Sequence, residues 1–208
     1  MRATGETRQT SLSLIEGVRN RDPEKWSRFC DLFSPLIYDW CRRSGVTQDD
    51  APDVVQDVMT SVATSIDSFR REKTSDTFHG WLWAVTRHRV LDHFRRLAKQ
   101  PAAAGGSTAA YQINQYPDMI PEQLDQESRD IDTRRVYQRA LELLEAEFEQ
   151  KTWTCFLRVT ADEAAPVDIA DELGMTVGAV YNAKCKVLKR LREELAGLLP
   201  VGNEHSAD

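Results

Sequence analysis

The chain has 208 residues and a formal net charge of −6, with 41% hydrophobic and 29% charged residues. This length suits one large domain or two small ones, and no apolar run approaches the ~20 residues of a membrane helix. The N-terminus lacks the apolar stretch of a signal peptide, so we expect a soluble, cytoplasmic protein without membrane contact. The acidic total argues, at first sight, against nucleic acid as a partner, because phosphates attract positive charge.

Apolar residues recur at helical spacing, whereas strand-like alternation never persists, so the pattern predicts an all-α protein. Composition divides the chain into an N-terminal helical domain over 11–100, a flexible linker over 101–125 and a C-terminal helical domain over 126–199. The predicted helices, in chain order, cover 23–44, 49–65, 78–98, 131–148, 166–173 and 177–197.

Cysteine and histidine placement predicts neither a metal nor another cofactor. No C-x-x-C pair occurs, and no histidine lies at metal-ligand spacing from Cys30, Cys41, Cys155 or Cys185. We therefore expect reduced thiols, while a redox-sensing cysteine stays open. An enzyme is the weakest functional hypothesis and we expect no catalytic residues, because the helical His88 and His93 diverge and no carboxylate pair accompanies them.

Two basic islands interrupt the acidic chain. Residues 1–100 carry 16 basic and 14 acidic residues, whereas residues 101–208 carry 11 and 19. The islands lie at 87–99 and 184–192, both on predicted helices. A distant phosphate responds to such a local island more than to the total charge, because salt screens over ~8 Å. Each island predicts a nucleic-acid contact or, alternatively, a solvated helix face.

The second island follows the spacing of a helix-turn-helix. Ala170, Gly174 and Val180 occupy the positions of the small crossing residue, the turn glycine and the buried branched residue. Thr176 can cap the second helix. The outward face of that helix carries Asn182, which can hydrogen-bond adenine, together with lysines that suit guanine or phosphate.

The first island adjoins aromatic side chains. Trp81 and Trp83 precede the basic residues, although for Trp83 we favour core packing. Aromatic rings beside cations are typical of single-stranded DNA binding, where bases stack and phosphates are neutralised. The polar loop 68–77 adds Arg70, Arg71 and Lys73 to this cationic region.

The preceding helix presents an acidic patch. Asp53, Gln56 and Asp57 fall at i, i+3 and i+4 and so share one face. Because such a patch repels DNA, it suggests a protein partner with a basic surface. A plain solvated face is the alternative.

Together these elements resemble the extracytoplasmic-function (ECF) sigma factors of bacterial RNA polymerase. The matching motifs, in order, are D-x-V-Q-D-V at 53–58, F-x-x-W-L-x₄-R-x₄-D-x₂-R-R at 78–96 and, after the linker, a helix-turn-helix ending in K-R-L-R at 189–192. The resemblance implies RNA polymerase core and promoter DNA as partners. It implies three contact surfaces on the chain. The residues implied to bind the polymerase core are Asp53, Val54, Gln56 and Asp57. The residues implied to bind the minus-ten element are Arg70, Arg71, Lys73, Trp81, Arg87, His88, Arg95 and Arg96. The residues implied to bind the minus-thirty-five element are Thr176, Gly178, Ala179, Tyr181, Asn182, Lys186 and Lys189.

Two departures from the family pattern stand out. His88 occupies a position where the family usually has asparagine, and Pro52 replaces an acidic residue at the start of the docking helix. A helix-turn-helix repressor or activator with an N-terminal interaction domain is the alternative function. It would leave the acidic patch and the aromatic–basic helix unexplained. The promoter sequence, the inducing signal and an anti-sigma partner stay open.

Overall fold

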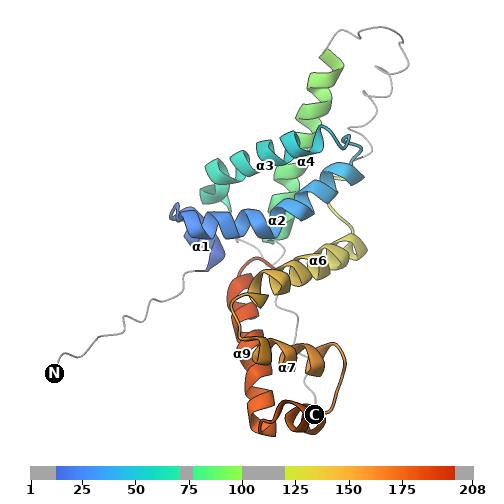
Figure 1. Cartoon of the computed structure of the whole chain (residues 1–208). Coiled ribbons are helices and arrows are strands. Elements are labelled where there is room, and N and C mark those ends of the chain that lie inside the picture. The colour runs from blue at the N-terminus through green and yellow to red at the C-terminus, as the bar shows by residue number, and fades with distance from the viewer. Residues whose placement is uncertain (1–12, 71–76, 100–119, 200–208) are drawn as a thin grey trace, which may run out of the picture.

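The computed structural model describes residues 13–70, 77–99 and 120–199, and within these ranges every regular element is helical. The first group of helices comprises α1 (Leu14–Arg19), α2 (Pro23–Arg43), α3 (Ala51–Ser65), the short 3₁₀ helix η1 (Ile66–Ser68) and α4 (Phe78–Lys99). The second group comprises α6 (Gln126–Glu145), α7 (Gln150–Thr160), α8 (Pro166–Leu173) and α9 (Val177–Leu195). Figure 1 shows the first group above the second, with α6 at the top of the second group, next to the first.

Local capping explains where the first helices begin. The side chain of Asp22 accepts hydrogen bonds from the first-turn backbone of α2, and Pro23 stands at the first helical position. The sequence interpretation missed α1, although Ser13 and Glu16 form a capping box that satisfies two backbone donors reciprocally. The S-x-x-E spacing was the available signal.

Helices α1 to α4, which we call the N-terminal bundle, enclose an aromatic core. The rings of Phe29, Phe33 and Phe78 lie 4.8–5.9 Å apart in tilted and edge-on arrangements. Trp40 is fully buried, and its ring meets that of Trp83 edge-on at 5.4 Å. These contacts bury large apolar areas, which fixes α4 against α2 and makes the bundle a rigid support for whatever α4 presents.

Helices α7 to α9 form the predicted helix-turn-helix unit with its supporting helix. Ile169, Ala170 and Val180 are buried in a small core that Cys155 completes from α7. Gly174 ends α8 at φ 58°, the left-handed conformation that glycine adopts without strain. The hydroxyl of Thr176 accepts from the backbone of Ala179 at 3.2 Å, which confirms the predicted cap. Helix α7 itself was not predicted.

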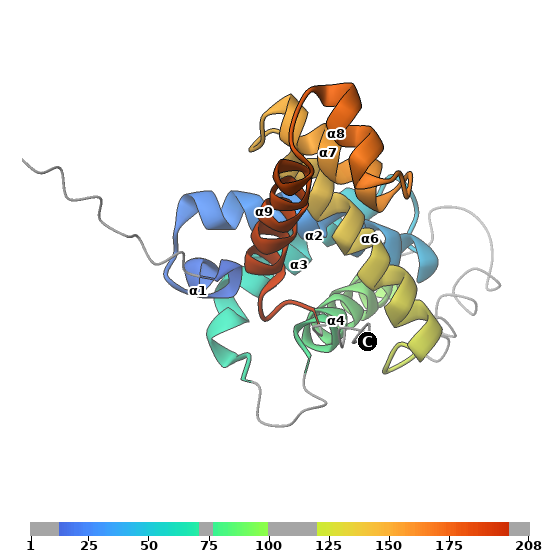
Figure 2. The same cartoon turned by 90° about the horizontal axis from the view of Figure 1, so that it is seen from below.

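The two halves of the chain share one hydrophobic core. Val136, Ala140 and Leu144 on α6, with the residues from Leu191 to Leu199 around the end of α9, belong to the same buried cluster as the N-terminal bundle. The C-terminal end of α9 lies next to α1 and α2 (Figure 1 and Figure 2), where Glu194 accepts from Arg28. The C-terminal half therefore packs directly on the first domain in addition to being connected to it through the chain.

The linker prediction falls mainly on residues 100–119, which lie outside the described residues. Within its last part, Ile120 is buried and Leu124 packs against the shared core. Helix α6 begins five residues earlier than predicted because Asp125 caps its first turn. Among the described residues, no helix is long and apolar enough to cross a membrane.

Candidate nucleic-acid and protein interfaces

A cavity of about 500 Å³ opens beside the first turns of α4. Its volume is in the range of small-molecule pockets, roughly 300–1,000 Å³. One wall comes from the N-terminal bundle, through Phe69, Arg70 and Trp81. The other wall comes from residues Glu122–Leu124 and from Arg129. We call residues 120–129 the covering segment.

Trp81 and Trp83 have different environments, as the sequence predicted. Trp83 is buried against Trp40, whereas Trp81 is only partly buried and lines the cavity. The ring of Trp81 packs 5.5–5.6 Å from those of Phe69 and Phe78, which holds it in place. A partly exposed aromatic ring beside Arg70 is a suitable surface for stacking a nucleobase.

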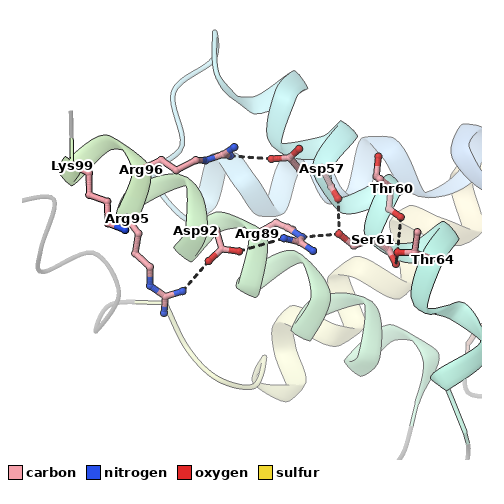
Figure 3. A pocket seen from close by; sticks show the side chains of 9 residues that line it. All are labelled: Asp57, Thr60, Ser61, Thr64, Arg89, Asp92, Arg95, Arg96 and Lys99. Atoms are coloured by element: carbon pink, nitrogen blue, oxygen red, sulfur yellow. Dashed lines mark hydrogen bonds and ion pairs between the residues drawn. The ribbon is translucent and has the colours of Figure 1, made fainter.

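The arginines of α4 are paired within the chain. Arg95 donates to Asp92 at 2.9 Å, and Arg96 donates to Asp57 at 2.9 Å (Figure 3). Arg87 donates through Nε to the carbonyl oxygen of Ile120 at 3.2 Å. The pairs of Arg95 and Arg96 are largely exposed, so they hold these arginines weakly and leave them able to exchange partners with a phosphate.

His88, at the position where the family usually has asparagine, is an exposed residue with Nδ1 3.3 Å from Oδ2 of Asp92. His93 lies on the other side of α4, where burial lowers its pKa although the nearby Asp50 opposes this shift. The two histidines therefore diverge as the sequence indicated. Among the described residues, no group of three His, Cys, Asp or Glu side chains could hold a metal ion.

Helix α3 presents the predicted acidic patch in part. Asp53 and Gln56 are exposed, and Asp57 is half-buried in its pair with Arg96. Val54 is 1% exposed and belongs to the core, so in this structure it supports the helix from behind instead of forming surface. The surface available to a partner therefore consists of polar side chains on the solvent side of α3.

The outward face of α9 is exposed over its first three turns. Tyr181, Asn182, Lys186 and Lys189 are all exposed, as are Thr176 and Gly178 at the start of the helix, while Ala179 is half-buried. Lys186 places its ammonium group 6.0 Å from the ring centroid of Phe148. Arg190, in the same basic island, instead bonds the carboxylates of Glu147 and Glu194. Within this island, Lys186 and Lys189 are therefore exposed to solvent, whereas Arg190 is held in an ion-pair network.

Two predicted residues, Arg71 and Lys73, lie outside the described residues. Conversely, the sequence interpretation missed Asp132 and Arg28, which join the halves of the molecule. Asp132 is fully buried on α6, and Arg28 on α2 bonds Glu147 and Glu194. An aspartate in the middle of a helical pattern was the one visible signal, and it does not reveal its partners.

Part of the N-terminal bundle matches a known protein family. The sigma-70 region 2 family matches residues 31–100, which run from within α2 to the end of α4. Most of the N-terminal bundle, including the acidic helix α3 and the cationic helix α4, therefore matches region 2 of a sigma factor, and we refer to it as region 2. The all-helical, two-part fold agrees with this class.

The chain is also similar to proteins called ECF RNA polymerase sigma factor SigD in Mycobacterium bovis and in two strains of Mycobacterium tuberculosis. Each is 28% identical over 172 residues, which cover 79% of this chain and 74% of the relative. Together with the region 2 match, these similarities support an ECF sigma factor, as the motifs indicated. This family is a non-catalytic transcription initiation factor, and the alternative of a repressor is not favoured.

Proposed function

We propose that this sigma factor directs bacterial RNA polymerase to its promoters in the cytoplasm through three separate surfaces. Transcription initiation requires a polymerase contact, recognition of duplex DNA and capture of a melted strand. The chain offers an exposed acidic stretch on α3, an exposed polar face on α9 and the cavity beside Trp81. The observation that carries this division is that each surface has its own chemistry and lies on a different helix.

The acidic surface of α3 suits the polymerase core. Asp53 and Gln56 project to solvent from a helix whose opposite side, including Val54 and Val58, is locked in the core. A rigid helix with a fixed acidic face loses little entropy when it docks on a basic protein surface.

The cavity suits an unstacked base of the melted minus-ten strand. Trp81 supplies an aromatic surface and Arg70 a cation, while the cations farther along α4, Arg95 and Arg96, suit the phosphates on either side. Base stacking contributes ~1–3 kcal/mol per base, so a single captured base stabilises strand opening measurably.

The face of α9 suits the major groove of the minus-thirty-five element. Asn182 can form a bidentate pair with adenine, and Lys186 and Lys189 can reach guanine or phosphate. These side chains are exposed on α9, a helix that starts far from the N-terminal bundle (Figure 1).

Run-off transcription on genomic fragments with core polymerase from the same organism tests the proposal. Full-length protein should stimulate defined transcripts, and Asp53→Arg should abolish them because it reverses the charge of the docking surface. Asp49→Arg, an exposed reversal just before α3, is the matched control and should retain at least half of the activity. Unchanged transcription with Asp53→Arg would remove α3 as the docking surface.

A further inference from the structure

A buried carboxylate fixes α6 on the N-terminal bundle. Asp132 is 0% exposed and accepts hydrogen bonds from Nε1 of Trp40 at 2.7 Å and Nη2 of Arg43 at 2.8 Å. Nε2 of His79 lies 3.3 Å from Oδ2 of Asp132, the same oxygen that accepts from Trp40. All three partners belong to α2 or α4, so Asp132 specifies one position of α6 on region 2.

The position of α6 determines the position of the covering segment. Residues 120–125 lead directly into α6, and the first turn of α6 brings Arg129 to the cavity. Ile120 is buried, and its carbonyl oxygen holds Arg87. As long as α6 stays bound, the covering segment forms part of the cavity wall and engages Arg87, one of the cations that the family resemblance assigns to the minus-ten element.

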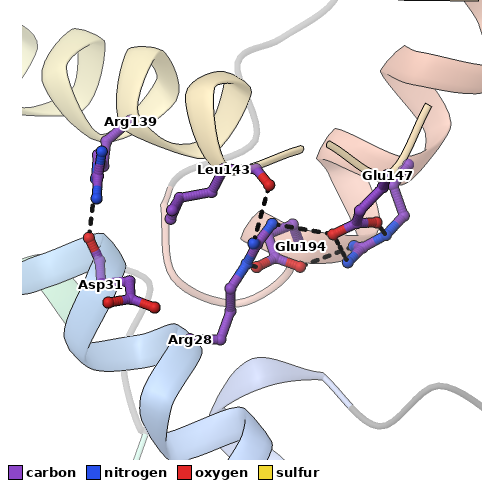
Figure 4. A network of polar contacts seen from close by, with 7 residues as sticks. Arg28, Asp31, Arg139, Leu143, Glu147 and Glu194 are labelled. Atoms are coloured by element: carbon purple, nitrogen blue, oxygen red, sulfur yellow. Dashed lines mark hydrogen bonds and ion pairs between the residues drawn. The ribbon is translucent and has the colours of Figure 1, made fainter. Parts of the chain in front are cut away.

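A second charged contact holds the end of α9 to the same bundle. Nε of Arg28 donates to Glu194 at 2.6 Å, and its Nη2 donates to Glu147 at 3.1 Å (Figure 4). Arg190 donates to the same two carboxylates at 2.7–3.1 Å, which completes a ring of four charges. Glu194 is 4% exposed, so this ring forms only when α2 and α9 are together.

Charged contacts of this kind make a reversible attachment. A buried ion pair gains attraction but loses hydration, so its net contribution to association is small compared with an apolar contact of equal area. When α6 leaves, water again solvates Asp132 and Arg43. The apolar contacts of Val136, Ala140 and Leu144 with the shared core add to the attachment, so a partner must compete for both kinds of contact to displace α6.

We propose that Asp132 is an autoinhibitory latch, which keeps the covering segment over the Trp81 cavity until a partner displaces α6. The isolated protein then captures single-stranded DNA poorly, and separation of α6 from α2 exposes the cavity and frees Arg87. This inference rests on the proposed function for the identity of the ligand. The movement of α6 can be tested without that assumption.

Hydrogen exchange and strand binding together test the latch on the full chain. Asp132→Asn keeps the shape of the side chain but removes the charge that Arg43 neutralises. We expect amide exchange over residues 120–145 to become about tenfold faster, with exchange in α3 and α8 unchanged. Fluorescence anisotropy with labelled ten-nucleotide single strands of random sequence should show about tenfold tighter binding.

Two further variants make the result decisive. Asp130→Asn removes the same charge from an exposed site two residues away and should behave as the parent in both measurements. Arg43→Gln opens the latch from α2 and should shift both readouts in the same direction as Asp132→Asn, which guards against a folding defect peculiar to one variant.

Each alternative outcome identifies what fails. Unchanged exchange over 120–145, or exchange that rises equally in α3, would overturn the latch. Faster exchange with an unchanged, measurable strand affinity would overturn its control of the cavity. Faster exchange without strand binding by any variant would support movement of α6 and count instead against the proposed DNA ligand.

Discussion

The two proposed DNA-binding surfaces differ in how far other parts of the chain enclose them. The face of α9 is exposed along Tyr181, Asn182 and Lys189. The cavity of region 2, by contrast, has Glu122, Gln123 and Leu124 as part of its own wall. One surface is presented ready for binding, whereas the other depends on where α6 lies.

The difference follows from how each region is stabilised. The helix-turn-helix has its own small core around Ile169 and Val180, so its outward face needs no support from elsewhere. Region 2 shares its core with α6 and the end of α9, and its cavity lies close to that junction. Five changes, in decreasing order of expected effect, test whether the regions are as distinct as this comparison implies.

Trp40 should have the largest effect, because region 2 packing and the α6 contact both depend on it. Trp40→Ala removes a fully buried ring and the indole donor of Asp132, so we expect the free energy of unfolding to fall by about 3–5 kcal/mol. Urea denaturation followed by circular dichroism measures this loss. Trp153→Ala, the buried counterpart on α7, should instead loosen the helix-turn-helix unit and leave hydrogen exchange in α3 unchanged.

Acid should loosen the junction between the halves before the helix-turn-helix. Burial acts to raise the pKa of Asp132, but His79, Trp40 and Arg43 outweigh it, and its pKa lies below the usual value. Burial also acts to raise the pKa of Glu194, but the hydrogen bonds and charges of Arg28 and Arg190 outweigh it, so the pKa of Glu194 is lowered as well. A carboxylate with a depressed folded-state pKa contributes stability that is complete above the unfolded pKa, near 4, and is lost as pH falls through the folded pKa.

Thermal unfolding between pH 7 and pH 3 measures this acid response. The melting temperature of the parent protein should decrease once the pH is lowered below about 4. The double variant Asp132→Asn/Glu194→Gln should show a smaller decrease because it lacks both carboxylates. An equal acid response in the double variant would show that other groups govern it.

Asn182 tests the exposed surface alone. Asn182→Ala should lose about 1–3 kcal/mol of discrimination at a single base pair of the duplex promoter, because a bidentate contact to one base disappears. Competition binding with holoenzyme and single-base promoter variants measures this loss. Lys189→Ala is the matched contrast: if it contacts phosphate, it should weaken binding to all sequences and reduce the salt dependence instead.

The cap of α9 should have a smaller effect. Thr176→Ala leaves the backbone N–H of Ala179 without its partner, so we expect about 1 kcal/mol less stability in the helix-turn-helix unit. Thermal denaturation measures the change. Thr60→Ala, an exposed threonine within α3 that bonds only the preceding turn, should stay within about 0.5 kcal/mol of the parent.

The exposed pair between Arg96 and Asp57 should contribute least to stability. Its side chains are 60% and 43% exposed, so Arg96→Gln should change the free energy of unfolding by less than about 1 kcal/mol. The same variant should weaken single-strand binding by holoenzyme if Arg96 contacts phosphate. A large stability loss with unchanged DNA binding would make the arginine structural and blur the distinction between the two surfaces.

Local sequence features determined most of the helices. Asp22 and Pro23 start α2, Gly174 and Thr176 form the turn between α8 and α9, and apolar spacing correctly placed Trp83 and Val90 in the core. These signals are readable because capping and helical periodicity act between residues at most a few positions apart. The sequence does not predict helix α7, because its threonines and aromatic residues have a weak intrinsic helix preference and its stability comes from packing.

Only the tertiary structure decided how the halves meet. Trp40 and Asp132 are 92 positions apart, and Arg28 and Glu194 are 166 apart, so no local pattern links either pair. An acidic residue within an amphipathic helix has the same local pattern whether it faces water or a buried arginine. The sequence by itself therefore specified most of the helices, the exposed face of α9 and the resemblance to the ECF sigma factors, whereas packing determined that the chain's own covering segment forms part of the wall of the region 2 cavity.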